Sequence, residues 1–317
     1  MNKELIADAF DILHQAQRIL VTSHVRPDGD AIGSLLGLGL ALQDNGKDVQ
    51  MIMADGVPKS FRHLSGSEQV HRKPKGTFDA IVVVDCSDLG RVGSVLDDLP
   101  DPDLSIDHHI TNLPFARVNL VDSDATSTTE MLTALLPALK LSLSKPIAEA
   151  LLTGLITDTL GFRTTNMRPQ ALRAAADLMA FGIDLPVLYR KVLLSRSYHA
   201  ARYWGRGLSN LQLENRIVWT SLTLDDRQAV DYPGRDDADL INVLSTIEDA
   251  DVALIFVEQK DDTVKVSWRS RPGFDVAKVA FQFGGGGHKP AAGAELEGPL
   301  DEVQQKVLEA TRAIMHP

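Results

Sequence analysis

The chain has 317 residues, of which 44% are hydrophobic and 24% charged, and its 43 acidic and 32 basic residues give a net charge of −11. This length is sufficient for two domains with separate cores, and the composition is that of an ordinary globular protein. An acidic chain is not expected to bind long nucleic acid through many phosphate contacts, although a small anionic substrate in a local basic pocket is compatible with it.

Three features predict a cytoplasmic location without membrane contact. Residues 1–17 combine acidic side chains with helical apolar spacing, which is unlike a signal peptide. The longest apolar run, residues 32–42, is shorter than the roughly 20 residues that a membrane-spanning helix needs. Cys86 is the single cysteine, so it cannot form a disulfide within the chain, which fits a reducing compartment.

The first half of the chain alternates between strand-like and helix-like segments. Short apolar runs predict strands at 19–21, 49–53, 81–84 and 104–109. Apolar periodicity predicts helices at 5–13, 31–43, 127–139, 145–157, 168–181 and 185–194. This order predicts an α/β domain over residues 1–190, built on a doubly wound and mostly parallel sheet.

The order of elements changes in the last third of the chain. We expect a helical connector at 191–212 and then strands at 217–224, 252–257 and 264–268. Helices are predicted at 237–247 and near Val276, before the glycine-rich segment "FGGGGHKPAAG". These features predict a smaller α+β domain for substrate binding over residues 213–317.

The predicted strands and helices of the first domain end in side chains that can bind a metal ion. Such residues follow three strands and close one helix: His24, Asp28, Asp30, Asp85, Asp107, His108, His109 and Asp158. Because doubly wound sheets bind ligands outside the carboxyl ends of their strands, we expect these residues to converge in one crevice. Singly, each segment has a plainer interpretation: a solvated turn ("RPDGD"), a helix cap (Asp85), a strand-end cluster ("DHH") or a surface carboxylate (Asp158).

The joint arrangement of these residues favours a metal site with more than one ion. Carboxylates that converge without a cation repel one another and raise each other's pKa values. Mixed imidazole and carboxylate ligands favour manganese, with cobalt, magnesium, zinc or iron as alternatives. Two metal ions about 3.5–4 Å apart clamp a phosphoryl group and generate hydroxide at neutral pH, so the pattern predicts phosphoester hydrolysis.

Several motifs resemble those of the DHH phosphoesterase superfamily. In the first domain they are "HVRPDGDAIGS", "VVVDCSD", "SIDHHITN", "DATSTTEML" and "GLITDTLGFRTTN", and in the second "SWRSR" and "FGGGGHKPAAG". They follow the order of that superfamily over essentially the whole chain. The second group resembles the DHH-associated substrate domain, and the chain is most similar to the nano-RNase/pAp-phosphatase (NrnA-like) group.

The resemblance implies a set of roles at the first site. One manganese ion would be held by His24, Asp28 and Asp85, and the other by Asp30, Asp85, His108 and Asp158. Asp85 would bridge the two ions, and a bridging hydroxide would attack the phosphorus. Asp107 would orient the ligands, and His109 would contact the phosphate or assist the leaving group. A packing role is the alternative for His109.

The C-terminal motifs suit an anionic nucleotide. In "WRSR", Arg269 and Arg271 fall on one side of a predicted strand, and guanidinium groups suit phosphate. In "GGGGHKPAAG", successive glycines predict a backbone nest for an anion, with His288 adding a side-chain contact. Surface arginines and a glycine linker are the alternatives. With the resemblance, the expected substrate contacts are Arg163, Arg269, Ser270, Arg271, Gly285, Gly286, Gly287 and His288.

The resemblance implies an enzyme with two Mn²⁺ ions that acts on small nucleotides. Its substrates would be very short oligoribonucleotides, including linear pApA and pGpG, cut to 5′-mononucleotides, and 3′-phosphoadenosine 5′-phosphate (pAp), converted to AMP. We expect neither long nucleic acid nor membrane as a partner, and a homodimer is a family-level expectation only.

Four other functions share part of this pattern. A cyclic dinucleotide phosphodiesterase has the same core motifs. A family II pyrophosphatase would share the ligands but not the glycine-rich loop. A RecJ-like exonuclease would carry further nucleic-acid-binding domains and more basic surface. A non-catalytic nucleotide sensor would usually have lost a ligand, and none is missing here.

Overall fold

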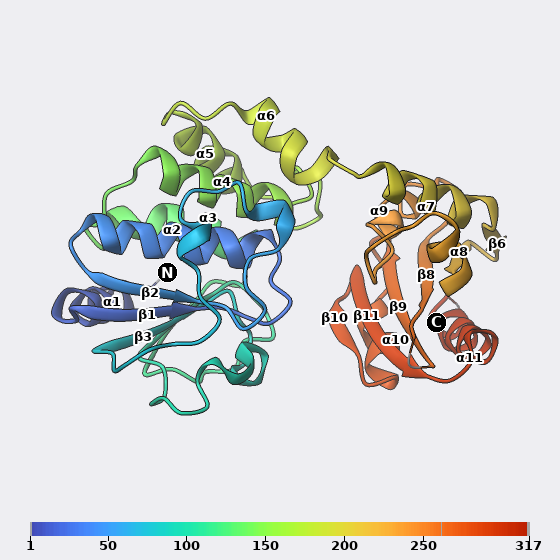
Figure 1. Ribbon diagram of the computed structural model, residues 1–317, viewed down its shortest axis with the longest axis horizontal. Coiled ribbons are helices and arrows are strands. Elements are labelled where there is room, and N and C mark those ends of the chain that lie inside the picture. The colour runs from blue at the N-terminus through green and yellow to red at the C-terminus, as the bar shows by residue number, and fades with distance from the viewer. Residues whose placement is uncertain (1, 261, 316–317) are drawn as a thin grey trace. The chain divides into compact units, whose positions relative to one another are not determined.

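The computed structural model describes residues 2–260 and 262–315 and divides the chain into two compact units, residues 1–195 and 196–317 (Figure 1). Helix α7 (Tyr198–Ser209) falls within the expected connector, but it belongs to the second unit, where its Tyr203 packs into a core with Leu222 and Leu240. Every helix in the described part of the chain is too short or too polar to span a membrane.

The first unit is an α/β fold around a five-stranded parallel sheet, as the sequence predicts. Its strands are β1 (Arg18–Thr22), β2 (Asp48–Ile52), β3 (Ala80–Val84), β4 (Leu104–Asp107) and β5 (Val118–Val121). The order across the sheet is β2-β1-β3-β4-β5, and every neighbouring pair is parallel. The strand order therefore reverses at β1, and the crevice between the ends of β1 and β3 is where such sheets bind their ligands.

Helices cover the two faces of this sheet unequally. The α-helices are α1 (Lys3–Gln15), α2 (Gly29–Asp44), α3 (Thr128–Ala138), α4 (Lys145–Asp158), α5 (Pro169–Met179) and α6 (Leu185–Tyr189), and a π turn (Arg190–Leu194) continues α6. Short 3₁₀ turns are η1 (Lys59–Phe61), η2 (Ser67–Gln69) and η3 (Leu89–Val95). The larger core joins one sheet face to α1–α4, with α4 lying over α2 and α3 (Figure 1). On the other face, Val92 and Val95 of η3 pack against β1 and β3.

Glycines on α2 and α4 let these two helices approach closely. A methyl group at Gly33 would lie 2.5 Å from the carbonyl oxygen of Ala150 on α4. A methyl group at Gly154 of α4 would lie 2.8 Å from both Asp30 Oδ1 and Thr129 Oγ1. The helices can therefore pack closely because glycine has no side chain at these positions, and this contact brings Asp30 of α2 beside the end of α4.

The second unit contains a six-stranded mixed sheet. Its remaining elements are β6 (Gln212–Glu214), β7 (Ile217–Leu222), α8 (Leu224–Ala229), α9 (Leu240–Leu244), β8 (Val252–Glu258), β9 (Thr263–Ser270), α10 (Val276–Gln282), β10 (Gly286–His288), β11 (Ala291–Glu297) and α11 (Leu300–Ala313). The order is β10-β11-β9-β8-β7-β6, with β7 and β8 parallel and the other pairs antiparallel. One sheet face packs on α10 and α11 and the other on α7–α9, so this unit is α+β as expected.

The close contact at Gly154 yields a stability prediction. Gly154→Ala places a methyl group among Asp30 and Thr129, and such overpacking costs about 1–3 kcal/mol, more than the gain in helix propensity of about 1 kcal/mol. We expect the melting temperature of the variant to fall. Gly205→Ala on α7 is the matched control, since its methyl group meets nothing within 4 Å and should leave the melting temperature unchanged or higher. Equal melting temperatures for the two variants would contradict tight packing at Gly154.

Candidate metal centre

The loop after β1 places His24 and Asp28 at the switch point of the sheet. Asp28 caps α2, because its Oδ1 accepts hydrogen bonds of 3.1 Å from the backbone N–H groups of Asp30 and Ala31. His24 Nδ1 lies 2.8 Å from the carbonyl oxygen of Val25, which can only accept, so Nδ1 carries the proton. His24 Nε2 then faces Asp28 as a potential ligand atom, 3.9 Å from its Oδ1.

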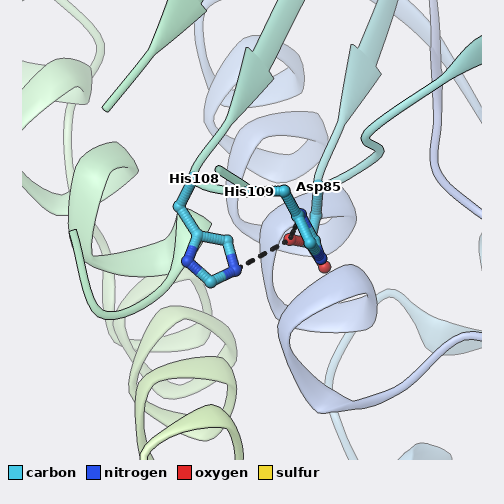
Figure 2. Close-up of side chains that lie close together, drawn as sticks. All are labelled: Asp85, His108 and His109. Atoms are coloured by element: carbon cyan, nitrogen blue, oxygen red, sulfur yellow. Dashed lines mark ion pairs between the residues drawn. The ribbon is translucent and has the colours of Figure 1, made fainter. Parts of the chain in front are cut away.

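Asp85 follows β3 and lies at the centre of the cluster. Its side chain is buried, and its backbone is in the left-handed region with a φ of 53°. Three imidazole nitrogens surround its carboxylate: His24 Nε2 at 3.7 Å, His108 Nε2 at 3.7 Å and His109 Nδ1 at 3.8 Å. Figure 2 shows His108 and His109 beside Asp85. The cap of the following 3₁₀ turn is Asp88, whose Oδ1 accepts from the N–H of Arg91, so Asp85 is not the helix cap that its position also suggested.

The end of β4 supplies Asp107, His108 and His109 in three different orientations. His108 Nε2 reaches toward Asp30 Oδ2 at 3.9 Å and Asp158 Oδ2 at 3.7 Å. Asp107 is buried and contacts His109, with its Oδ1 2.7 Å from His109 Nδ1. Its other oxygen, Oδ2, accepts a 2.7 Å hydrogen bond from the amide of Asn112. Asp107 therefore holds His109 in place without facing the other carboxylates.

All six ligand residues expected from the sequence come together in the structure. Within the described residues, three groups have ligand atoms within 4.8 Å of one another: His24, Asp28 and Asp85; Asp30, His108 and Asp158; and Asp85, His108 and His109. The first two groups match the two expected ligand sets, and Asp85 joins the second through its 3.7 Å approach to His108. The donor atoms are carboxylate oxygens and imidazole nitrogens, a set that suits divalent transition metals.

The pKa values of the cluster shift in opposite directions. Burial, followed by the charges of neighbouring carboxylates, raises the pKa values of Asp30 and Asp158 well above their usual range. Burial also acts on Asp85, but the surrounding His24, His109 and His108 outweigh it and lower the pKa of Asp85. The cluster thus holds more acidic groups than its histidines can neutralise, which is the electrostatic condition that a bound cation relieves.

His109 differs from the other histidines of the site in its environment. Burial acts to lower its pKa, but the hydrogen bond to Asp107 and the charge of Asp85 raise it to about 9. In the metal-free protein, the imidazole is therefore protonated at neutral pH. A cationic His109 beside the cluster is suited to hold a phosphate oxygen or to donate a proton.

Three of the expected substrate contacts of the second unit, Arg269, Gly286 and His288, share one face of its sheet. Arg269 on β9 pairs with Ala291 on β11, and Ala291 pairs with His288 on β10, so the three residues form one row. In the next row, a methyl group at Gly286 would meet no atom within 4 Å. The guanidinium of Arg269 is oriented by a 3.3 Å hydrogen bond to Asn242 Oδ1. This part of the sheet face, formed by Gly286, Gly293 and Ala291, carries few side chains and is flanked by Arg269 and His288; we call it the floor.

The other expected substrate contacts are placed differently. The side chain of Ser270 lies on the opposite face of the sheet from that of Arg269. Its hydroxyl oxygen lies 3.1 and 3.2 Å from the carbonyl oxygens of Phe274 and Lys289. Arg271 Nη2 donates to a carbonyl oxygen of the loop after α9, and Arg163 is exposed in the loop after α4. Gly285 and Gly287 allow the backbone of β11 to approach, because a methyl group at either would overlap it. The glycine run forms part of a paired strand, where an anion-binding nest was expected.

Sequence reasoning did not single out the hydroxyl residues that contact the acidic cluster. Thr128 and Thr129, in the first turn of α3, donate hydrogen bonds to Asp30, and the Thr128 hydroxyl also donates to Asp85. The run "ATSTTE" reads as a helix start, since Ser127 followed by Glu130 has the spacing of a capping box. That signal predicts the helix boundary but not the contact with the distant carboxylates.

Comparisons with known proteins agree with this geometry. Residues 18–155 match the model of the DHH family, N-terminal domain, and residues 230–316 match the DHHA1 domain. The chain is 36% identical to the bifunctional oligoribonuclease and PAP phosphatase NrnA of Thermus thermophilus, over 93% of this chain and 89% of that protein. It is 26% identical to the cyclic-di-AMP phosphodiesterase GdpP of Geobacillus thermodenitrificans, over 95% of this chain but only 48% of that protein.

A solved structure extends the likeness to the whole fold. The crystal structure of an exopolyphosphatase-related protein from Bacteroides fragilis superposes with a TM-score of 0.91. The match covers 99% of this chain and 97% of the other, at 27% identity. Both units of this chain therefore have counterparts in that protein.

The contact between His109 and Asp107 yields a prediction on pH dependence. Since Asp107 helps to raise the pKa of His109 from 6.5 to about 9, the protonated imidazole stabilises the metal-free fold fully below pH 6.5, and this contribution is lost as the pH rises through 9. We expect the stability lost in Asp107→Asn to be largest below pH 6.5 and to shrink toward pH 9, measured by urea unfolding in chelator. Asp184→Asn, which keeps a cap on α6, should show no such trend. A difference that stays constant with pH would contradict the coupling.

Proposed function

The chain belongs to the DHH family and is an enzyme of the phosphoesterase class, and on this premise we propose that it acts on small nucleotides with two divalent cations. Its proposed substrates are very short oligoribonucleotides, hydrolysed to 5′-mononucleotides, and pAp, hydrolysed to AMP. Manganese is the preferred metal of the proposal. The activity named for the Thermus thermophilus relative supports both substrates, because the likeness extends over both units.

One observation carries the proposal: Asp85 lies between two groups of ligand residues. Its Oδ2 faces His24 at 3.7 Å, and its Oδ1 faces His108 at the same distance. A carboxylate that presents one oxygen to each group is placed to bridge two cations. His24 and Asp28 would complete one ligand set, and Asp30, His108 and Asp158 the other.

The residues around the centre have distinct roles in the proposed reaction. Two divalent cations, when bound, would neutralise the phosphate and lower the pKa of a water molecule. His24 keeps its proton on Nδ1 through the carbonyl of Val25, which leaves Nε2 available to a metal ion. Asp107 keeps His109 oriented, and we assign the protonated imidazole to a phosphate oxygen or the leaving group.

The second unit would recognise the nucleotide. Arg269 and His288 flank a floor of small residues, on which a base or ribose could lie without meeting side chains. A guanidinium group held by Asn242 is oriented for a phosphate. The Ser270 hydroxyl lies on the other face, within hydrogen-bond distance of two backbone carbonyls, so its direct contact with substrate stays a prediction.

A cyclic dinucleotide phosphodiesterase is the second candidate function. The likeness to the Geobacillus GdpP protein supports it, since it spans 95% of this chain. That relative is about twice as long, so about half of its length has no counterpart here. A panel of pAp, pApA, pGpG and cyclic di-AMP with Mn²⁺ separates the two: cleavage of the cyclic compound faster than pApA would favour the second candidate.

The bridging position of Asp85 yields a prediction on metal content. The metal-free protein should bind about two Mn²⁺ per chain, and chelator should abolish hydrolysis of pApA. Asp85→Asn keeps the shape of the side chain but removes its charge, so we expect weaker Mn²⁺ binding and activity at least about 100-fold lower. Asp184→Asn serves again as the control for loss of one carboxylate. Full activity in chelator, or wild-type turnover by Asp85→Asn, would refute the two-metal proposal.

The charge of the chain yields a prediction on substrate length. With a net charge of −11, each added nucleotide brings repulsion with little compensating contact, so activity should peak at two to about five nucleotides. At equal concentration, a dinucleotide should turn over faster than a 24-nucleotide RNA; the reverse order would indicate an exonuclease of long strands.

The Arg269→Ala variant should show a higher KM for the dinucleotide with unchanged metal content. The control is Arg312→Ala on α11, which packs on the opposite face of the sheet, and it should change neither quantity.

A further inference from the structure

The first turn of α3 is bonded to two carboxylates of the metal centre. Asp30 accepts hydrogen bonds from the backbone N–H groups of Thr128 at 2.6 Å and Thr129 at 3.0 Å. The Thr129 hydroxyl also donates to Asp30, at 2.6 Å, and the Thr128 hydroxyl donates to Asp85 at 2.9 Å. All four residues are buried, so water does not compete for these bonds. Thr128 thus contacts both carboxylates, one through its backbone and the other through its side chain.

The proton inventory of this turn is consistent with ionised carboxylates. Each threonine hydroxyl has a single proton, which Thr129 gives to Asp30 and Thr128 to Asp85. The Thr129 oxygen, 2.9 Å from Ser127 Oγ, then accepts the proton of Ser127. Ser127 Oγ in turn accepts the backbone N–H of Glu130. The four donors of Thr128 and Thr129 thus all point to Asp30 or Asp85, and the positive end of the 11-residue helix adds to their effect.

The turn is also fixed on its outer side. Glu130 Oε2 accepts 2.7 Å hydrogen bonds from both the backbone N–H and the hydroxyl of Thr126. Its other oxygen, Oε1, accepts a 2.6 Å bond from Arg168, which also reaches Asp122. The position of Thr128 is therefore set by a network that does not depend on the carboxylates it holds. Such a rigid donor can orient a ligand before a metal ion arrives.

We propose that Thr128 is a positioning residue that couples Asp30 and Asp85, and that its hydroxyl sets how tightly both cations bind. The proposal rests on the two-metal function given above. Because Asp85 faces both ligand groups, loss of its hydrogen bond to Thr128 affects both binding events. The Thr129 hydroxyl donates to Asp30 and not to Asp85, so its loss affects only the event that involves Asp30.

The test compares variants that differ by one oxygen atom. Thr128→Ser and Thr128→Ala both lose the γ-methyl group, and only the serine variant keeps the hydroxyl. Titration calorimetry of the metal-free proteins with MnCl₂ should give near wild-type affinity for Thr128→Ser and an affinity about 10- to 100-fold lower for Thr128→Ala in both binding events. Thr129→Val should weaken one event only.

Thr133→Val is the control for a purely structural effect. Thr133 lies one turn further along α3, is buried, and bonds its hydroxyl to the carbonyl oxygen of Thr129. Its loss should lower the melting temperature without changing the affinity for Mn²⁺. Equal affinities for Thr128→Ser and Thr128→Ala would overturn the role of Thr128, provided that the wild-type protein binds two ions. A wild-type protein that binds none would instead refute the proposed function.

Discussion

Asp30, Asp85 and Asp158 approach one another inside the first unit, where each charge raises the cost of ionising the next. Burial and these neighbours raise the pKa values of Asp30 and Asp158 well above normal, so the carboxylates cannot all be ionised without compensation. His24 and His108 provide part of it from the ends of β1 and β4. A divalent cation would neutralise the negative charge that remains. We therefore interpret this cluster of strand, loop and helix ends as a site for positive charge.

The carboxylates can come together because glycines let the helices that carry them pack closely. Asp30 lies at the start of α2, a helix that contacts α4 through glycines. Gly154 leaves the space in which Asp30 meets Thr129, and the same close approach brings Asp158 at the end of α4 into reach of His108. Packing and electrostatics are therefore linked, because a larger residue at position 154 would displace a carboxylate as well as a helix.

The convergence of the candidate metal ligands was predictable from the sequence for a simple reason. Parallel strands place their carboxyl ends on one edge of a sheet, so polar residues after apolar runs, such as His24, Asp85 and His108, were expected to meet there. Thr128 was not predictable in this way. It bonds to a carboxylate 98 residues away, and a hydroxyl before a helix has an ordinary local explanation as part of a cap. Local patterns reveal which residues end an element, but not which distant groups that end will contact.

In the second unit, the sequence did not predict two strands or the neighbours that they bring together. Strands β10 and β11 were not predicted, since glycine and alanine carry little strand propensity. Alternation along β9 separates Arg269 from Ser270, whereas the resemblance implied substrate contacts for both. The pairing of β10 with β11 then puts His288 in the row of Arg269, a neighbour that no spacing along the chain predicts.

The left-handed backbone of Asp85 narrows what evolution or design can place at this position. Among residues with a side chain, asparagine and aspartate tolerate a φ of 53° best, and of these two only aspartate carries charge. Glutamate, which could otherwise serve as a longer carboxylate ligand, meets both an unfavourable backbone and a displaced charge. The backbone conformation and the proposed bridging role thus favour the same amino acid independently. Any replacement of Asp85 therefore loses either the carboxylate charge or the side chain that this backbone conformation tolerates.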